Sequence, residues 1–219
     1  MTASRSPVGL FGGTFDPVHF GHLRPAVELL QALGLAELRL VPGHIPPHRR
    51  LPRASPAYRL RLIQRSVQGV PGLRVDDCEL RRDGPSYTVE TLRRFRASLG
   101  PEQPLCFILG ADAFLGLTGW YRWHELTDYA HLVVMNRPDS PLDDLPSELA
   151  AWLAKRRLSR QQLRLAPAGG IRIERVSPVS VSSSGIRRCM ARGESARYLV
   201  PEPIWQSIAG AGVYGYPQL

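Results

Sequence analysis

The chain has 219 residues, which is enough for one large domain or two small ones. Its apolar fraction of 43% is ordinary for a soluble globular protein and argues against disorder. The formal charge of +9 is compatible with a nucleic-acid partner, whereas no apolar stretch approaches the roughly 20 residues of a membrane-spanning helix.

Short apolar runs alternate with amphipathic stretches along the chain. Strands are expected at residues 8–11, 38–41, 73–75, 105–109, 132–135 and 171–176. Helices are expected at residues 23–33, 56–67, 88–98, 147–157, 183–191 and 203–209. This order predicts an α/β fold, a Rossmann-like doubly wound parallel sheet with helices on both faces. Such a sheet binds ligands beyond the carboxyl ends of its strands, so the site is expected on the loops that follow them.

The loop after the first strand reads GGTFDPVHFGH, from Gly12 to His22. Its two glycines allow the backbone to turn tightly and to approach a ligand. The helix that follows offers free N–H groups and the positive end of its dipole, which favour phosphate. His19 and His22 are three residues apart, so both imidazoles can donate hydrogen bonds to one phosphoryl group. An isolated His-x-x-His is a weak signal, and a metal site would need a third ligand at useful spacing.

A second phosphate motif follows the strand at 171–176. The segment from Val179 to Arg187 reads VSVSSSGIR. Serines that open a helix are natural N-caps, and the N–H groups there can hold a phosphate with which Arg187 pairs one turn later. Taken alone, this segment is more often a structural cap than a ligand site.

The string from Gly12 to His22 resembles the signature of the nucleotidyltransferase superfamily whose members carry His-x-Gly-His. The serine segment is similar to the Ile-Ser-Ser-Thr-x-Ile-Arg segment of that superfamily, with Val181 in place of Ile and Ser184 in place of Thr. Within the superfamily, the chain resembles bacterial nicotinate mononucleotide adenylyltransferase over essentially its whole length. Five segments carry this resemblance: PGHIPPHR at 42–49, SYTVET at 86–91, GAD at 110–112, WYRW at 120–123 and NRP at 136–138.

The resemblance implies transfer of AMP from ATP to nicotinate mononucleotide, giving nicotinic acid adenine dinucleotide and pyrophosphate. Mg²⁺ is the expected cofactor, and it would arrive with ATP rather than on protein side chains. The catalytic residues would be His19, His22 and Arg187. The residues expected to bind ATP are Gly12, Gly13, Thr14, Phe15, His19, His22, Ser183, Ser184 and Arg187.

The resemblance also implies a pocket for the mononucleotide. Trp120 would stack on the pyridine ring, and backbone N–H groups near Tyr87 and Thr88 would hold the nicotinate carboxylate. Asp112 would hydrogen-bond a ribose or orient a site group. The residues expected near phosphates are His48, Arg49, where the family often has lysine, and Arg137. From the residues alone, a core role is favoured for Trp120, and a helix cap is as good an interpretation of Asp112 as a ligand contact.

Two alternatives stay open. The acceptor could be the amide, nicotinamide mononucleotide, which differs from the acid by one charge. A different class is a basic nucleic-acid-binding protein, supported by the net charge and by the basic run between Lys155 and Arg164. Lys155 is the one lysine among the 28 lysine and arginine residues. This excess of arginine indicates the codon composition of the source genome rather than a functional patch.

The expected organisation is a single nucleotidyltransferase domain over residues 1–219, with a C-terminal helical segment, 183–219, that completes the ATP site. Cys78, Cys106 and Cys189 match neither a disulfide framework nor a Cys-x-x-Cys metal pattern, so a reducing, cytoplasmic compartment is expected. The expected partners are the small-molecule substrates, without nucleic acid or membrane, and the protein would be a monomer or a homodimer.

Overall fold

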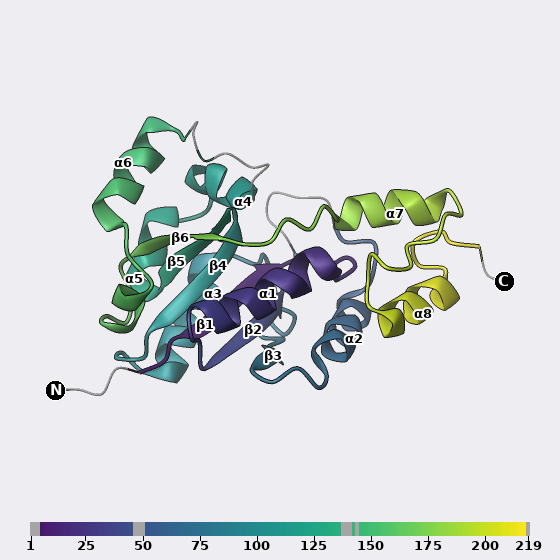
Figure 1. Ribbon diagram of the computed structural model, residues 1–219, viewed down its shortest axis with the longest axis horizontal. Coiled ribbons are helices and arrows are strands. Elements are labelled where there is room, and N and C mark those ends of the chain that lie inside the picture. Colours follow the sequence, from purple (N-terminus) through teal and green to yellow (C-terminus); the bar gives the residue numbers. More distant parts are fainter. Residues whose placement is uncertain (1–4, 46–50, 137–141, 143–144, 218–219) are drawn as a thin grey trace.

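Six strands form one parallel sheet in the computed structural model, which describes residues 5–45, 51–136, 142 and 145–217. The strands are β1 Val8–Gly13, β2 Glu37–Pro42, β3 Leu73–Val75, β4 Leu105–Gly110, β5 His131–Asn136 and β6 Ile171–Arg175. Their order is β3-β2-β1-β4-β5-β6, and each neighbouring pair is parallel (Figure 1). The chain therefore winds outward from β1 to β3 in one direction and from β4 to β6 in the other.

The helices are α1 Phe20–Ala32, α2 Pro56–Val67, α3 Thr88–Leu99, α4 Ala111–Leu115, α5 Leu126–Tyr129, α6 Ser147–Arg156, α7 Ser183–Ala191 and α8 Glu202–Ala211. Local chemistry sets several of their ends. Ser55 accepts the N–H of Tyr58 at 3.3 Å and Pro56 follows it, a favourable start for α2. The expected helices are present, whereas α4, α5 and the 3-10 turns between them were not expected. Four or five residues span less than two helical turns, too few to show a periodic pattern.

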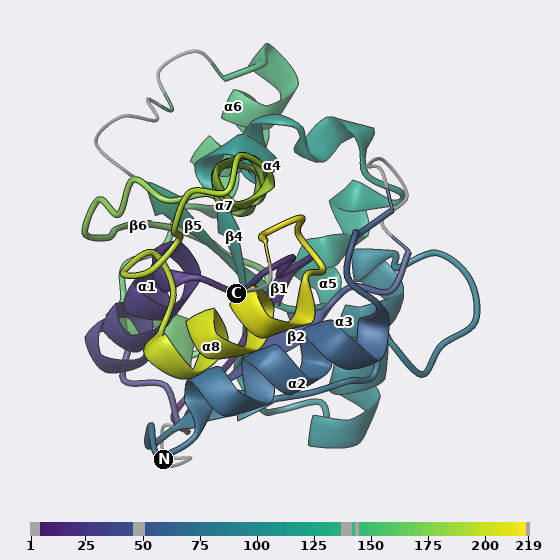
Figure 2. The ribbon, with the colours of Figure 1, turned by 90° about the vertical axis from the view of Figure 1, so that its right-hand side faces the viewer.

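The sheet separates two cores. In β4, Cys106 and Ile108 belong to the core formed with α1, α2, α7 and α8, whereas Leu105, Phe107 and Leu109 pack with α3, α4 and α6. Successive strand side chains point to opposite faces, so a strand covered on both sides is apolar throughout. Helices therefore cover both faces (Figure 2), and the predicted Rossmann-like doubly wound sheet is confirmed.

The C-terminal helices α7 and α8 lie beyond the sheet, and α8 runs beside α2 (Figures 1 and 2). The hydroxyl of Tyr58 in α2 donates to the carbonyl of Ser207 in α8 at 2.9 Å. This contact helps to hold the end of the chain next to the loops that follow the strands. In the described part of the chain, no helix is long and apolar enough to cross a membrane.

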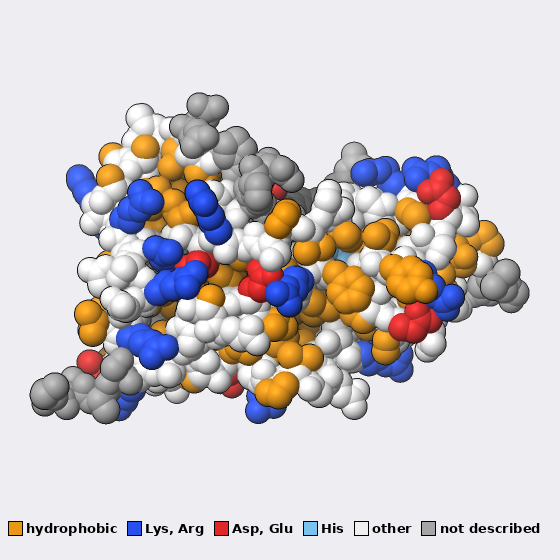
Figure 3. Space-filling model, viewed as in Figure 1, with side chains coloured by type: hydrophobic (Ala, Val, Ile, Leu, Met, Phe, Trp, Pro, Cys, Tyr) orange, Lys and Arg blue, Asp and Glu red, His pale blue; other side chains and the backbone are white. Residues whose placement is uncertain are grey.

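The basic run from Lys155 to Arg164, which begins in the last turn of α6, serves in part for internal contacts. Arg160 pairs with the buried Glu174 of β6, and Arg164 donates to the carbonyls of Leu33 and Gly34 at 3.3 and 3.2 Å. On the face shown in Figure 3, the basic side chains are dispersed and acidic ones stand between them. Part of the basic run is therefore engaged in contacts within the chain, which leaves fewer of its charges for a partner.

Candidate active site

Two cavities meet at the carboxyl ends of β1 and β4, where the winding direction of the sheet changes. The histidine pocket has a volume of about 710 Å³ and is lined by His19, His22 and the start of α7. The tryptophan pocket has a volume of about 360 Å³ and is lined by Trp120 and the start of α3. Both share a wall made of Gly12, Gly13, Thr14, Gly110, Asp112 and Ala113. This switch point is the place where doubly wound sheets bind their ligands.

Phe15 shapes the glycine turn that ends β1. Its φ is 50°, and its buried ring lies 5.0 Å from the His22 ring at an interplanar angle of 72°. A Cβ atom on Gly13 would come within 2.9 Å of the Phe15 ring, closer than carbon atoms approach without displacement. Glycine at this position therefore leaves room for the Phe15 ring, which packs against the His22 ring.

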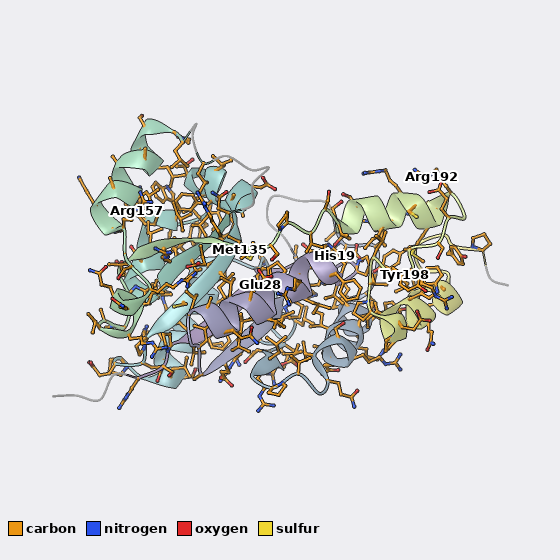
Figure 4. The ribbon with its side chains drawn as sticks, viewed as in Figure 1. His19, Glu28, Met135, Arg157, Arg192 and Tyr198 are labelled. Atoms are coloured by element: carbon orange, nitrogen blue, oxygen red, sulfur yellow. The ribbon has the colours of Figure 1, made fainter. Side chains whose placement is uncertain are left out.

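His19 and His22 form a stacked pair at the start of α1. Their ring centroids are 3.7 Å apart with an interplanar angle of 31°. The backbone N–H of His19 donates to Nδ1 of His22 at 3.3 Å, so a neutral His22 carries its proton on Nε2. Figure 4 shows His19 where α1 begins and Met135 at the end of β5, and both residues line the histidine pocket. The pair thus places two imidazole rings side by side in the pocket. The N–H groups at this helix start, expected to be free, have partners within the chain: that of Phe20 donates to the carbonyl of Leu199 at 3.2 Å, and that of His22 donates to the carbonyl of His19 at 2.8 Å.

The start of α7 faces the histidines across the same pocket. Ser182 caps the helix, since its Oγ accepts the N–H of Gly185 at 3.1 Å. A Cβ atom on Gly185 would lie only 3.1 Å from this Oγ, which accounts for a glycine in the first turn. A Cβ atom on Gly21 would lie 2.8 Å from the carbonyl oxygen of Val181. The glycine of His-x-Gly-His therefore allows the serine segment to approach α1 closely.

Asp16 joins the glycine turn to distant segments. Its buried carboxylate accepts the N–H groups of Arg53 and Ala54 at 2.8 and 3.1 Å and the hydroxyl of Tyr214 at 2.8 Å. Its backbone carbonyl accepts Nη1 of Arg187 at 2.5 Å, and that nitrogen lies 3.6 Å from the carboxylate. Burial raises the pKa of Tyr214, so its hydroxyl stays protonated and remains the donor in this hydrogen bond. One carboxylate therefore ties together the turn, the segment before α2 and the C-terminus.

Arg59 is a fully buried arginine behind the same turn. Its Nη1 donates to the carbonyl of Thr14 at 2.7 Å, whereas Nε and Nη2 have no hydrogen-bond partner among the described residues. Burial lowers the pKa of Arg59, and the negative charge of Asp16 acts in the opposite direction. Because an isolated buried charge is costly, Arg59 and Asp16 stabilise each other beneath the loop.

The tryptophan pocket combines an aromatic face with a helix start. Trp120 is half-buried, and its ring lies 6.5 Å from that of Phe107 at an angle of 69°. Tyr87 and Thr88 line the same cavity, and α3 begins there with no side-chain cap in the described part of the chain. The positive end of the α3 dipole is therefore available to an anion. A flat ring that bears a carboxylate would complement both features.

The structure sorts the predicted residues into the two cavities. The histidine pocket is lined by Gly12, Gly13, Thr14, Phe15, His19, His22, Ser183, Ser184 and Arg187. The tryptophan pocket is lined by Tyr87, Thr88, Asp112 and Trp120, and the exposed Asp112 lines both. The predicted residues His48, Arg49 and Arg137 lie outside the described residues.

Several lining or supporting residues were not predicted. Asp16 stands inside the glycine string, but no role was assigned to it, and Arg59, Glu79 and Tyr214 gave no signal. Their importance depends on burial and on partners far away in the chain. Among the described residues, no group of three or more His, Cys, Asp or Glu side chains is placed to hold a metal ion.

The sheet and its two adjoining cavities define a nucleotide-binding α/β protein. Family comparison agrees: the Cytidylyltransferase-like model matches residues 10–189. A protein of Halorhodospira halophila named "Probable nicotinate-nucleotide adenylyltransferase" is 53% identical over 213 residues, which cover 97% of each chain. A protein of the same name from Aeromonas hydrophila is 46% identical over 96% of this chain and 98% of its own. This chain therefore belongs to the cytidylyltransferase-like family and, within it, to the nicotinate-nucleotide adenylyltransferases.

Solved structures confirm the fold. The Plasmodium falciparum nicotinic acid mononucleotide adenylyltransferase complexed with NaAD superposes with a TM-score of 0.76 at 14% identity, over 98% of this chain and 100% of that one. The putative nicotinate-nucleotide adenylyltransferase of Vibrio parahaemolyticus gives a TM-score of 0.63 at 15% identity, over 95% of both chains. At these identities the likeness concerns the architecture alone.

Proposed function

We propose that this chain transfers AMP from ATP to nicotinate mononucleotide. A phosphate oxygen of the mononucleotide attacks the α-phosphorus of ATP, the bond to the β-phosphate oxygen breaks, and pyrophosphate leaves. The observation that carries the proposal is the wall of Gly12, Gly13 and Thr14 shared by two cavities of different character. Two substrates bound on either side of this wall would meet at the glycine turn. The names of the full-length sequence relatives support the same reaction.

The histidine pocket would bind the triphosphate. His19 and His22 would donate hydrogen bonds to its phosphates, and the N–H groups at the start of α7 would hold a second phosphate near Ser183 and Ser184. Arg187 would add a fixed positive charge, already oriented by the carbonyl of Asp16. Such a site accelerates the reaction by positioning and by stabilising charge in the transition state, without a protein nucleophile.

The tryptophan pocket would bind the mononucleotide. Trp120 would stack on the pyridine ring, and the N–H groups near Tyr87 and Thr88 would hold the carboxylate of the acid. Asp112, exposed between the two cavities, would hydrogen-bond a ribose or orient a site group. We also expect His48, Arg49 and Arg137 near the phosphates, as the family resemblance implies.

We further propose that Mg²⁺ enters with ATP as part of the substrate, where it neutralises the triphosphate. Residues 1–219 would form one domain whose C-terminal segment, 183–219, completes the ATP site. The bond from Tyr214 to Asp16 supports this view. The three cysteines are free thiols, which suits the expected cytoplasmic compartment.

Pyrophosphate release tests the proposal. The purified protein is incubated with ATP, Mg²⁺ and either the acid or the amide mononucleotide, and kcat/KM is measured for each. We expect release with the acid and a higher kcat/KM for the acid than for the amide. No release with either acceptor would rule out the reaction, and equal values would rule out the acid preference while leaving adenylyl transfer in place.

A further inference from the structure

Glu79 is a buried carboxylate in the wall of the tryptophan pocket. It precedes α3 in the chain, and its side chain is 9% exposed. A carboxylate removed from water needs hydrogen bonds that replace those of the solvent. Burial raises the pKa of Glu79, and hydrogen bonds from neighbouring hydroxyls oppose that effect.

Two hydroxyl groups lie next to this carboxylate, one on each side of the α3 start. Thr91, in the first turn of α3, donates to Oε1 of Glu79 at 2.6 Å. Ser86 lies just before the helix, and its hydroxyl lowers the pKa of the same carboxylate; a Cβ atom on Gly43 would lie 3.9 Å from Oγ of Ser86 and 3.5 Å from Oε2 of Glu79. Ser86 Oγ accepts the N–H of His44 at 2.8 Å, so its own proton remains available to a nearby acceptor such as this carboxylate. The carboxylate therefore contacts the chain on both sides of Tyr87 and Thr88, at Ser86 before them and at Thr91 after them.

The same carboxylate lies next to the loop after β2. A Cβ atom on Gly43 would be 3.5 Å from Oε2 of Glu79, so the backbone passes close to the charge. Gly43 in turn donates its N–H to the carbonyl of Gly13 at 3.0 Å. Glu79 thus connects the start of α3 with the glycine turn that both cavities share.

We propose that Glu79 is a positioning residue of the acceptor pocket, which holds the first-turn N–H groups of α3 in place for the carboxylate of an acid mononucleotide. This inference rests on the proposed function, because it concerns the acceptor side of that reaction. Glu79 accepts the hydroxyl of Thr91 and lies beside that of Ser86, so it fixes the chain on both sides of the helix start whose N–H groups face the pocket. Ordered donors favour a carboxylate over an uncharged amide.

The test is direct binding, measured by calorimetry for nicotinate mononucleotide and separately for ATP. Glu79→Gln keeps the size of the side chain but leaves only one acceptor oxygen for two hydroxyl donors. Ser86→Ala removes the neighbouring hydroxyl but keeps the carboxylate of Glu79, so this variant provides the test if Glu79→Gln does not fold. The matched control is Glu90→Gln, a carboxylate on α3 that pairs with Arg93 at 3.1 Å outside the pocket lining.

We expect Glu79→Gln and Ser86→Ala each to weaken mononucleotide binding by at least about tenfold and to change ATP binding by less than about twofold. The double variant should bind no more weakly than the weaker single variant, since both act on one link. Glu79→Gln that binds like Glu90→Gln would overturn the inference, and so would equal weakening of both ligands. Wild-type protein that does not bind the mononucleotide would instead overturn the proposed function, and this inference with it.

Discussion

The hydroxyl of Tyr214 donates to Oδ1 of Asp16 at 2.8 Å, across a separation of 198 residues. Both side chains are buried, and the same carboxylate oxygen also accepts the N–H of Ala54. Asp16 stands between the glycine turn and His19, so the end of the chain is bonded to the loop that shapes the histidine pocket. Tyr214 therefore supports the site although it lines neither cavity.

Tyr214→Phe should lower the free energy of unfolding by about 1–2 kcal/mol, because a buried acceptor loses one donor while the ring stays in place. The control is Tyr216→Phe, which removes a hydroxyl from a neighbouring half-buried tyrosine that packs on Trp205. Urea unfolding of both variants measures the difference. The KM for ATP should also rise in Tyr214→Phe, since the turn is held less firmly. Equal stability of the two variants would show that the bond to Asp16 contributes nothing.

The positions of the strands follow from features that are local in sequence. Apolar runs such as 105–109 and 132–135 are short and flanked by turns, so they identify buried strands without any knowledge of partners. The glycine string and the serine cap are also local, and both line the histidine pocket. Local pattern was therefore sufficient for the fold class and for the residues that bear the phosphate motifs.

The supporting residues depend on distant contacts and could not be predicted in this way. Arg59 stands with Arg61 and Arg65 in one amphipathic stretch, and nothing in the spacing marks Arg59 as the one that is fully buried. Glu79 lies in a charged segment, and nothing in that segment marks it as buried. It lines the tryptophan pocket because α3 packs against it, with Thr91 donating to its carboxylate.

His19→Ala should lower kcat by at least about 100-fold and leave the fold intact. The imidazole lies 3.7 Å from that of His22 in the pocket proposed for the triphosphate, so its loss removes a donor that the transition state needs. His124→Ala is the control, because that histidine is exposed and lines neither cavity. Circular dichroism checks the fold of both. A decrease in kcat of less than about tenfold would remove His19 from the chemistry.

Trp120→Ala should mainly raise the KM for nicotinate mononucleotide, by about tenfold or more, because a stacking surface is lost. Trp120 lines only the tryptophan pocket, so the KM for ATP serves as the internal control and should change little. Steady-state kinetics with each substrate varied in turn separates the two constants. A change confined to the KM for ATP would mean that the two pockets have been assigned to the wrong substrates.

His131 should make the protein less stable as the pH falls. This buried histidine accepts the N–H of Gly170 on Nδ1 at 3.0 Å, and its Nε2 lies 2.9 Å from the carbonyl of Ala166, an arrangement that requires the neutral ring with its proton on Nε2. Burial, with a smaller effect from the positive charge of Arg96, lowers the pKa of His131 below its usual 6.5. The folded state therefore binds fewer protons than the unfolded state, and this contribution to stability is complete above pH 6.5 and is lost at lower pH.

Asparagine at this position cannot titrate, but its amide can still accept from Gly170 and donate to Ala166. His131→Asn should therefore reduce the dependence of the unfolding free energy on pH below about pH 6.5, by up to about 1.4 kcal/mol per pH unit. His124→Asn changes an exposed histidine and should leave the slope as it is in the wild type. Urea unfolding at several pH values gives the slopes. If His131→Asn kept the wild-type slope, the acid sensitivity of the protein would have to come from other groups.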